Sequence, residues 1–211
     1  MAKLSILGRK VGMTQVYDDK GNAVAVTVVE AGPCPIVQTK TTGRDGYVAL
    51  QISFGAARAK NTTKALKGHF EKAKAAPGRL LREVRLEEPG AYEVGQALTV
   101  ELFEVGTFVD VSGITKGRGF AGVVKRHGFT GGKATHGTTT HKQPGSIGAS
   151  AYPSRVVKNK RLPGHMGAAN YTAKNLKVVG VDKERNLLWI RGAVPGHVNS
   201  FLMIHQQKKG S

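Results

Sequence analysis

The chain begins with short apolar runs that are separated by glycine and other turn-forming residues. Runs that are rich in β-branched residues, or in which apolar and polar residues alternate, predict β-strands. Up to about residue 124 such runs occupy residues 23–29, 47–54, 98–103 and 108–114. Strands of this length and spacing are typical of a barrel or a sandwich, so the pattern predicts a mainly β fold.

One helical pattern interrupts these strands. Residues 66–73 carry apolar side chains at helical spacing, after the candidate N-cap residues Asn61 and Thr62. A Pro-Gly pair at residues 77–78 ends this run. A second short helix is expected at residues 80–84, where Leu and Val recur.

A long segment without strand patterns follows, and the patterns return only at residues 176–181, 187–190 and 201–204. The 46 residues from 125 to 170 contain only seven larger apolar side chains. Burial of each would contribute about 1.5–3 kcal/mol, whereas ordering each backbone residue costs about 1–2 kcal/mol. We therefore predict an insertion that is mobile when free and ordered by its partner. The alternative is a merely flexible surface loop, although loops of this length are uncommon in compact domains.

Charge is concentrated in the same part of the chain. Residues 111–181 contain no Asp or Glu but twelve Lys or Arg, thirteen Gly and four His, and so supply +12 of a formal net charge of +18. Such a surface favours a polyanion as partner. Anionic lipid would require a basic amphipathic helix, which the frequent glycines prevent. Nucleic acid is therefore the favoured partner.

The remaining composition indicates the compartment. A single cysteine, Cys34, excludes an intramolecular disulfide and fits a reducing compartment. Between Pro33 and Pro35 it is expected to be a small apolar residue in a rigid turn rather than a reactive thiol. The first ten residues lack the apolar region of a signal peptide, and no apolar run is long enough to span a membrane. We expect a soluble cytoplasmic protein without a membrane partner.

Residues 117–122 match G-x-G-x-x-G, a pattern that occurs in dinucleotide-binding turns and in kinases. Both interpretations fail on context, because each needs an acidic residue downstream and the next acid is Asp182. The motif then indicates a glycine-rich loop, with Arg118 in it, whose backbone can lie close to phosphate.

Four histidines in the basic segment could suggest a metal site: His127, His136, His141 and His165. Zinc sites also draw on Cys and carboxylates in tight local pairs, and this segment has neither. Catalytic dyads likewise need an acid or a paired histidine. We expect no metal, no cofactor, no small-molecule substrate and no enzymatic activity.

The remaining alternatives all involve nucleic acid. Proteins that read DNA usually present a compact helix to the major groove, and no such motif is visible here. A long basic glycine-rich strand suits a folded RNA, where shape and backbone contacts dominate. The residues alone thus predict a structured-RNA binder. An enzyme acting on RNA and a free-standing RNA chaperone are the rival interpretations.

Several stretches resemble the ribosomal protein L-three family of the large subunit. The stretch at 103–126 resembles the family signature at Phe103, Asp110, Gly113, Thr115, Gly117, Arg118, Gly119, Gly122 and Arg126. Residues 7–15 are similar to the family's N-terminus, residues 144–148 to the tip of its extension, and residues 192–196 to its C-terminal turn.

The resemblance implies a translation-factor-like β-barrel with a small α+β insertion and a long irregular basic extension. By position, the barrel would comprise residues 1–60, 95–124 and 171–206. The insertion would be residues 61–94, the extended arm that penetrates rRNA residues 125–170, and a tail residues 207–211. Some bacterial members carry a methylated glutamine after the tip motif. Ala149 stands there in this chain, so no modification is expected at that position.

The resemblance also implies a structural constituent of the large ribosomal subunit that binds 23S-type rRNA directly and helps to nucleate assembly. Its arm would extend toward the peptidyl transferase centre, and its partners would be rRNA and neighbouring large-subunit proteins in the cytoplasm. Phosphates are expected to be neutralised by Lys116, Arg118, Lys125, Arg126, Lys133, Lys142, Arg155, Lys158, Lys160 and Arg161. More directional contacts are expected from His127, His136, His141, Gln143 and His165.

Overall fold

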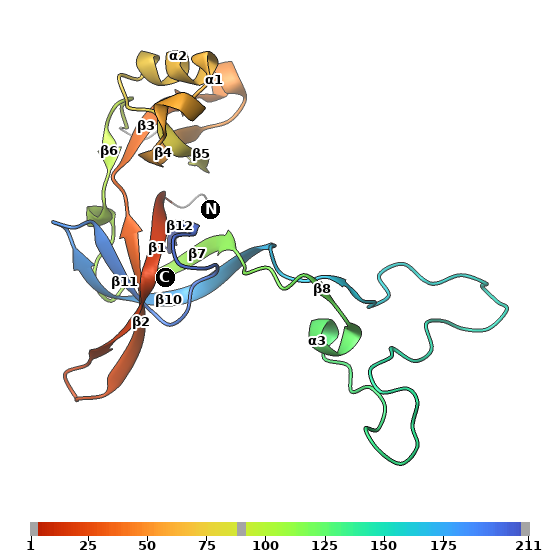
Figure 1. Ribbon diagram of the computed structural model, residues 1–211. Helices are drawn as coiled ribbons and strands as arrows, with labels where there is room; N and C mark the ends of the chain where they lie inside the picture. Colours follow the sequence, from red (N-terminus) through yellow and green to blue (C-terminus); the bar gives the residue numbers. More distant parts are fainter. Residues whose placement is uncertain (1–3, 88–91, 208–211) are drawn as a thin grey trace. The chain divides into compact units, whose positions relative to one another are not determined.

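The structure is a computed structural model that describes residues 4–87 and 92–207. The chain forms two compact units, Met1–Ile114 together with Asn170–Ser211, and Thr115–Ala169. Strands dominate the first unit (Figure 1), so the predicted mainly β fold class is confirmed. No helix within the described ranges is long and apolar enough to cross a membrane.

Six antiparallel strands of the first unit close into a barrel in the order β1-β12-β7-β10-β11-β2. Their bounds are β1 (Ser5–Tyr17), β2 (Ala23–Ala31), β7 (Phe108–Ile114), β10 (Asn170–Asp182), β11 (Leu187–Arg191) and β12 (Phe201–Gln206). Full closure leaves no unpaired sheet edge. The return of strand patterns after the basic segment is confirmed, because β10, β11 and β12 complete the barrel that β1, β2 and β7 begin.

Inward-facing β-branched side chains fill the barrel. Ile6, Val29, Val111, Val178 and Ile204 are each fully buried and belong to one apolar cluster. Branched side chains suit this position because they pack well on a pleated surface and have little rotamer freedom to lose. Their burial stabilises the barrel by about 1.5–3 kcal/mol for each side chain.

A second sheet of four strands, in the order β5-β4-β3-β6, lies beside helices α1 and α2 (Figure 1). Its strands are β3 (Cys34–Lys40), β4 (Ala49–Ala56), β5 (Gly78–Arg85) and β6 (Ala97–Leu98). The helices and turn of this part are α1 (Thr42–Asp45), α2 (Lys64–Lys72) and the 3₁₀ turn η1 (Ala59–Asn61). A further 3₁₀ turn, η2 (Val100–Leu102), contacts β10 of the barrel. Phe70 and Ala73 pack on Val37 of β3, which places the apolar face of α2 against the sheet.

The second sheet corrects several expectations. The run at residues 47–54, expected in the barrel, forms β4 and pairs with β3 and β5 instead. Strands β3 and β4 therefore leave the barrel part that was expected to span residues 1–60. An apolar run of this kind predicts a strand, but it does not specify which neighbouring strand it pairs with.

Two local expectations were also wrong. The expected helix at residues 80–84 is strand β5, because short apolar runs do not distinguish a strand from a helix and pairing with β4 decides the conformation. Helix α2 is capped by Thr63, whose side chain accepts a hydrogen bond from the amide of Leu66 at 3.4 Å, and not by Asn61 or Thr62.

Two further boundaries differ from expectation. Of the run at 98–103, only the start joins β6, and η2 follows. Residues 88–91 of the expected insertion and 208–211 of the expected tail lie outside the described residues.

A buried lysine joins two distant stretches of the chain. Lys10 of β1 is only 7% exposed, and its Nζ donates to the carbonyl oxygens of Val194 at 3.2 Å and Gly196 at 3.4 Å. A buried ammonium is tolerated where its donors meet acceptors. The stretch at residues 192–196, in the connection between β11 and β12, is therefore held against β1.

Cys34 is fully buried at the start of β3, and its Sγ donates to the carbonyl oxygen of Leu7 at 3.4 Å. Burial raises the pKa of this thiol to about 12. The expected role as a small apolar residue agrees with this burial, although the residue begins a strand rather than lying in a turn.

We predict that the Cys34 thiol is unreactive in the native protein at pH 8, because a raised pKa keeps the nucleophilic thiolate unpopulated and burial blocks access. A chromogenic disulfide reagent should label the chain only after denaturation by guanidinium. Rapid stoichiometric labelling of the native protein would contradict the buried position.

Candidate nucleic-acid interface

The basic unit, Thr115–Ala169, is inserted between two neighbouring barrel strands. The last residues of β7 and the first of β10 are paired, with Ile114 opposite Asn170. The same two chain segments stay paired inside the unit, where the Thr115 amide donates to the Ala169 carbonyl at 2.9 Å. Strand β8 (Phe120–Ala121) then pairs with β9 (Gly164–His165). The unit thus begins as a two-stranded ladder.

The glycines of the G-x-G-x-x-G motif shape this ladder. The Arg118 amide donates to the Met166 carbonyl at 2.8 Å, and the Met166 amide donates to the Gly119 carbonyl at 2.9 Å. Arg118 and Gly119 therefore both lie opposite Met166, as in a β-bulge, and Gly119 has a φ of +67° that favours glycine. The motif has a geometric role that is independent of any ligand.

Helix α3 (Val123–His127) holds the returning strand of the unit. The Nη1 of Arg126 donates to the carbonyl of Leu162 at 2.8 Å, and the Nε2 of His127 lies 3.0 Å from the same oxygen. A Cβ on Gly164 would lie 2.6 Å from that guanidinium nitrogen. Part of the hydrogen-bonding capacity of Arg126 and His127, both expected to contact RNA, is thus used within the protein.

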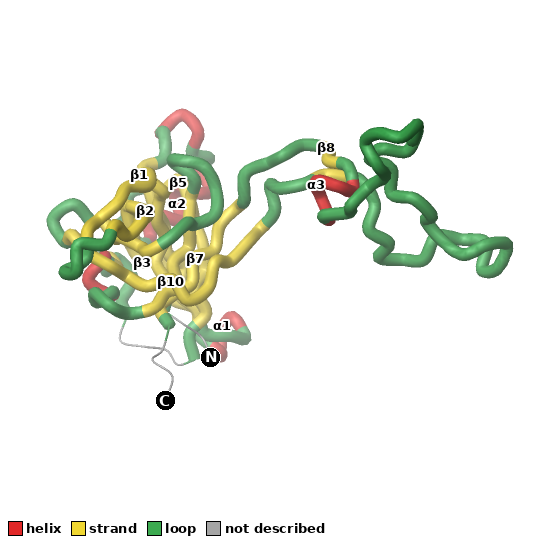
Figure 2. The backbone as a smooth tube through the Cα atoms, turned by 90° about the horizontal axis from the view of Figure 1, so that it is seen from below, coloured by secondary structure: helices red, strands yellow, loops and turns green. Residues whose placement is uncertain are grey.

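Residues 128–163, all of which the structure describes, contain no helix or strand (Figure 2). A few contacts close one loop inside this stretch: the Gly132 amide donates to the His141 carbonyl at 3.0 Å, and His141 Nδ1 lies 3.1 Å from the Lys133 carbonyl oxygen. Within the unit, every residue of which is described, only Ala121 and Val123 are buried. The scarcity of apolar side chains seen in the sequence thus gives a unit with almost no core.

Nearly all the predicted site residues are on the surface. His127 is half-buried, and the other fourteen are exposed. They comprise Lys116 and Arg118 before β8, Lys125 and Arg126 in α3, His165 in β9, and Lys133, His136, His141, Lys142, Gln143, Arg155, Lys158, Lys160 and Arg161 between α3 and β9. The structure brings the first five and His127 onto the ladder and its helix, and spreads the other nine along residues 133–161.

The charged side chains of the unit, Lys and Arg, are all of one sign, positive. Its ten Lys and Arg side chains have no carboxylate within residues 115–169 to pair with. Elsewhere carboxylates do pair: Arg9 lies 2.6 Å from Glu30, and Lys40 lies 2.9 Å from Glu83. Cations left without counter-charges produce a positive potential that attracts a polyanion. The described residues contain no cluster of His, Cys, Asp or Glu that could hold a metal ion.

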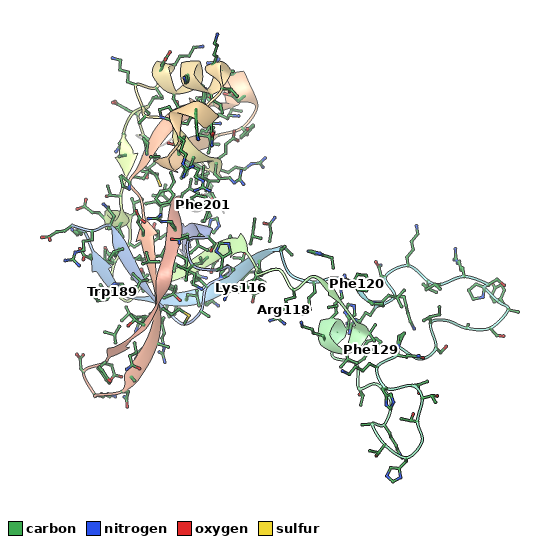
Figure 3. The ribbon with its side chains drawn as sticks, viewed as in Figure 1. Lys116, Arg118, Phe120, Phe129, Trp189 and Phe201 are labelled. Atoms are coloured by element: carbon green, nitrogen blue, oxygen red, sulfur yellow. The ribbon has the colours of Figure 1, made fainter. Side chains whose placement is uncertain are left out.

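Sequence reasoning missed the aromatic side chains of this surface. Phe120 is 80% exposed and Tyr152 is 90% exposed. Phe120 follows Lys116 and Arg118 along the same stretch of backbone (Figure 3), and Tyr152 precedes Arg155 by three residues. Aromatic residues between cations are the available sequence signal, because bases stack on such rings in proteins that bind single strands.

A closed β-barrel that carries an acid-free, largely irregular basic unit defines a class of proteins suited to binding structured nucleic acid. Comparison with known proteins agrees. Residues 78–187 match the family described as Ribosomal protein L3. The large ribosomal subunit protein uL3 of Carboxydothermus hydrogenoformans is 53% identical over 97% of this chain and 98% of its own length.

Other relatives match over nearly the whole chain as well. The uL3 protein of Pelotomaculum thermopropionicum is 52% identical over 97% of each chain. That of Brachyspira pilosicoli is 49% identical over 98% of this chain and 94% of its own. This chain therefore belongs to the ribosomal protein L3 family, and the resemblance found in the sequence is confirmed.

Substitution of a ladder glycine tests whether the ladder is ordered. Gly167 has a φ of +75°, and a Cβ there would lie 2.1 Å from the Lys116 carbonyl oxygen. We expect Gly167→Ala to open the ladder, so that the amides of Arg118 and Met166 exchange their hydrogens about 5- to 150-fold faster, since such strain costs about 1–3 kcal/mol.

Hydrogen exchange followed by mass spectrometry on the full chain measures this effect. The matched control is Gly122→Ala, because Gly122 has an ordinary φ of −69° and open space where the Cβ would lie. Equal exchange rates in the two variants would show that the ladder is not ordered as described.

Proposed function

We propose that this chain is a structural constituent of the large ribosomal subunit and binds large-subunit rRNA directly through the basic unit. The observation that carries the proposal is the exposure of fourteen of the fifteen candidate residues on a unit that has ten cations and no acid. The names of the relatives support the choice of the large subunit over other RNA particles.

The unit's few buried side chains suggest how it would act. With so little core, the segment gains order mainly from its partner, as expected for a chain that folds against RNA. Lysine and arginine side chains neutralise phosphates where rRNA helices converge, and glycines allow the backbone to approach closely. Binding of this kind early in assembly helps to nucleate the subunit by holding rRNA segments together.

The finer features follow from the same proposal. The barrel, of the kind shared with translation factors, lies near the ribosome surface and contacts neighbouring large-subunit proteins. Residues 125–170 form the arm that extends toward the peptidyl transferase centre, with its tip near residues 141–153. Ala149 cannot be methylated as a glutamine is, so whatever that modification assists is achieved otherwise in this chain.

Rival functions have weaker support. An enzyme acting on RNA would need an acid, a paired base or a cofactor site beside the bound strand, and the basic unit contains no carboxylate. A free-standing RNA chaperone would need the basic segment. It would not need a closed barrel in which residues 7–15 contact residues 192–196. Membership in the L3 family favours a resident protein of the subunit over both.

Affinity for large-subunit rRNA should depend steeply on salt. If some six to ten phosphates are engaged, affinity falls by roughly 10³–10⁵ between 50 and 200 mM salt, with duplex DNA as the guide. In the triple variant Lys158→Gln, Lys160→Gln, Arg161→Gln, the slope of log affinity against log salt should decrease by about two to three. Filter binding of rRNA transcribed in vitro measures both slopes.

A matched control removes the same charge elsewhere. Lys64, Lys67 and Lys72 are exposed on α2, and their replacement by glutamine should leave the slope unchanged. Salt-insensitive binding, or an equal effect of both triple variants, would count against binding through the basic unit.

Limited trypsin digestion tests where order depends on rRNA. In the free protein, early cuts should fall between Lys125 and Lys174, and bound rRNA should protect these sites. Peptide mass mapping over a time course locates the cuts. Early cuts throughout residues 4–54 would contradict a stable barrel with a separate partner-ordered segment.

A further inference from the structure

The ladder of the basic unit carries one strongly exposed aromatic side chain. Phe120 of β8 is 80% exposed, whereas the adjacent Ala121 is 3% exposed and Val123 is 1% exposed. A phenylalanine in water forgoes the stabilisation that burial would give it. Single exposed apolar residues are common, so exposure alone identifies no function. Its surroundings provide the second argument.

The ladder holds Phe120 in a defined place. It lies directly opposite His165 of β9, whose side chain is also exposed, so an aromatic ring and an imidazole are cross-strand neighbours on one face. The bulge at Arg118 and Gly119 lies just before this pair. Bulges commonly redirect a side chain next to a binding site.

Charge decides what could cover this pair. Lys116 and Arg118 precede Phe120 on the same stretch of backbone (Figure 3), and Arg126 follows in α3. An apolar pocket of another protein would cover the ring but would offer no negative charge to pair with these cations. A nucleotide brings both parts: a planar base for the ring and a phosphate for the cations.

Phe120 is better suited to this role than the other highly exposed aromatic residue of the unit. Tyr152 lies in residues 128–163, where no ladder restrains it. Phe120 is held by backbone pairing on both strands, so less conformational entropy is lost when a base stacks on its ring.

We propose that Phe120 and His165 form a stacking surface for an unpaired base of the bound rRNA, with Arg118 binding an adjacent phosphate. This inference rests on the proposed function and adds an uncharged contact to it. Stacking tolerates any base, because every base has a π-face. The surface therefore selects an unpaired nucleotide rather than a particular sequence.

Phe120→Leu tests the proposal, because leucine keeps an apolar side chain and the net charge but removes the aromatic face. Affinity for rRNA transcribed in vitro should fall about 5- to 150-fold, which corresponds to the roughly 1–3 kcal/mol typical for loss of one stacking ring. The salt slope should not change, because no charge is removed. Phe120→Trp should restore the affinity. Tyr17→Leu, at a 66% exposed aromatic residue of β1, is the matched control and should bind like the unaltered protein.

A spectroscopic readout identifies stacking directly. The chain has one tryptophan, Trp189, so Phe120→Trp in a Trp189→Phe background carries a single reporter at the proposed surface. Addition of poly(U) should quench its emission, since a stacked base quenches indole fluorescence. Chemical probing of the bound rRNA should show a base that the unaltered protein and Phe120→Trp protect and that Phe120→Leu leaves reactive.

The outcomes separate this inference from the proposed function. If Phe120→Leu binds rRNA as tightly and protects the same bases, the stacking surface is overturned while rRNA binding stands. If that variant binds rRNA normally but loses a neighbouring protein from the assembled subunit, Phe120 fills a protein pocket and the inference is again overturned. Failure of the unaltered protein to bind rRNA would instead overturn the proposed function.

Discussion

The pairing of β7 with β10 is the constraint on which the rest of the structure depends. These strands are neighbours in the closed barrel, and the basic unit is inserted between them. Because Ile114 lies opposite Asn170, both ends of the insertion are held together before any of it is ordered. Closing so long a loop costs conformational entropy, and apolar packing in the barrel, to which Val111 and Val178 contribute, offsets this cost. The paired ends of β7 and β10 therefore allow a unit with almost no core of its own to be inserted into the barrel.

Several residues of that unit have a structural role, and two of them, Arg126 and His127, are also proposed to contact RNA. Gly119 and Gly167 are needed for the ladder, since both have positive φ values. Arg126 and His127 bind the carbonyl of Leu162 and thereby anchor the returning strand to α3. A substitution at any of them would alter the shape of the surface as well as its contacts. Loss of function at these positions is therefore weaker evidence for direct RNA contact than loss at a side chain with no contact inside the protein.

The sequence predicted elements correctly where a local pattern specifies the conformation. It failed where pairing with a distant strand determines the conformation or the place of a segment. The helix at α2 followed from the spacing of its apolar residues, although its cap is Thr63. Strand β5 was mistaken for a helix, because the few apolar residues between Gly78 and Arg85 fit both periods and only pairing with β4 selects one. Residues 47–54 were correctly predicted as a strand but wrongly placed in the barrel, because a strand pattern does not specify its pairing partner. The exposure of Phe120 could not be read from a motif in which it is an unspecified position.

The amino-acid sequence by itself determined the mainly β character, the family and the location of the charge, because composition and residue spacing are properties of the chain alone. It also determined that residues 125–170 would lack a core, since a count of apolar side chains bounds what can be buried. Only the tertiary structure decided which strands close the barrel, which side chains hold the ladder and which face outward. These depend on partners far apart in the chain, such as Lys10 with Gly196 or Phe120 with His165, and no local pattern encodes such a pairing.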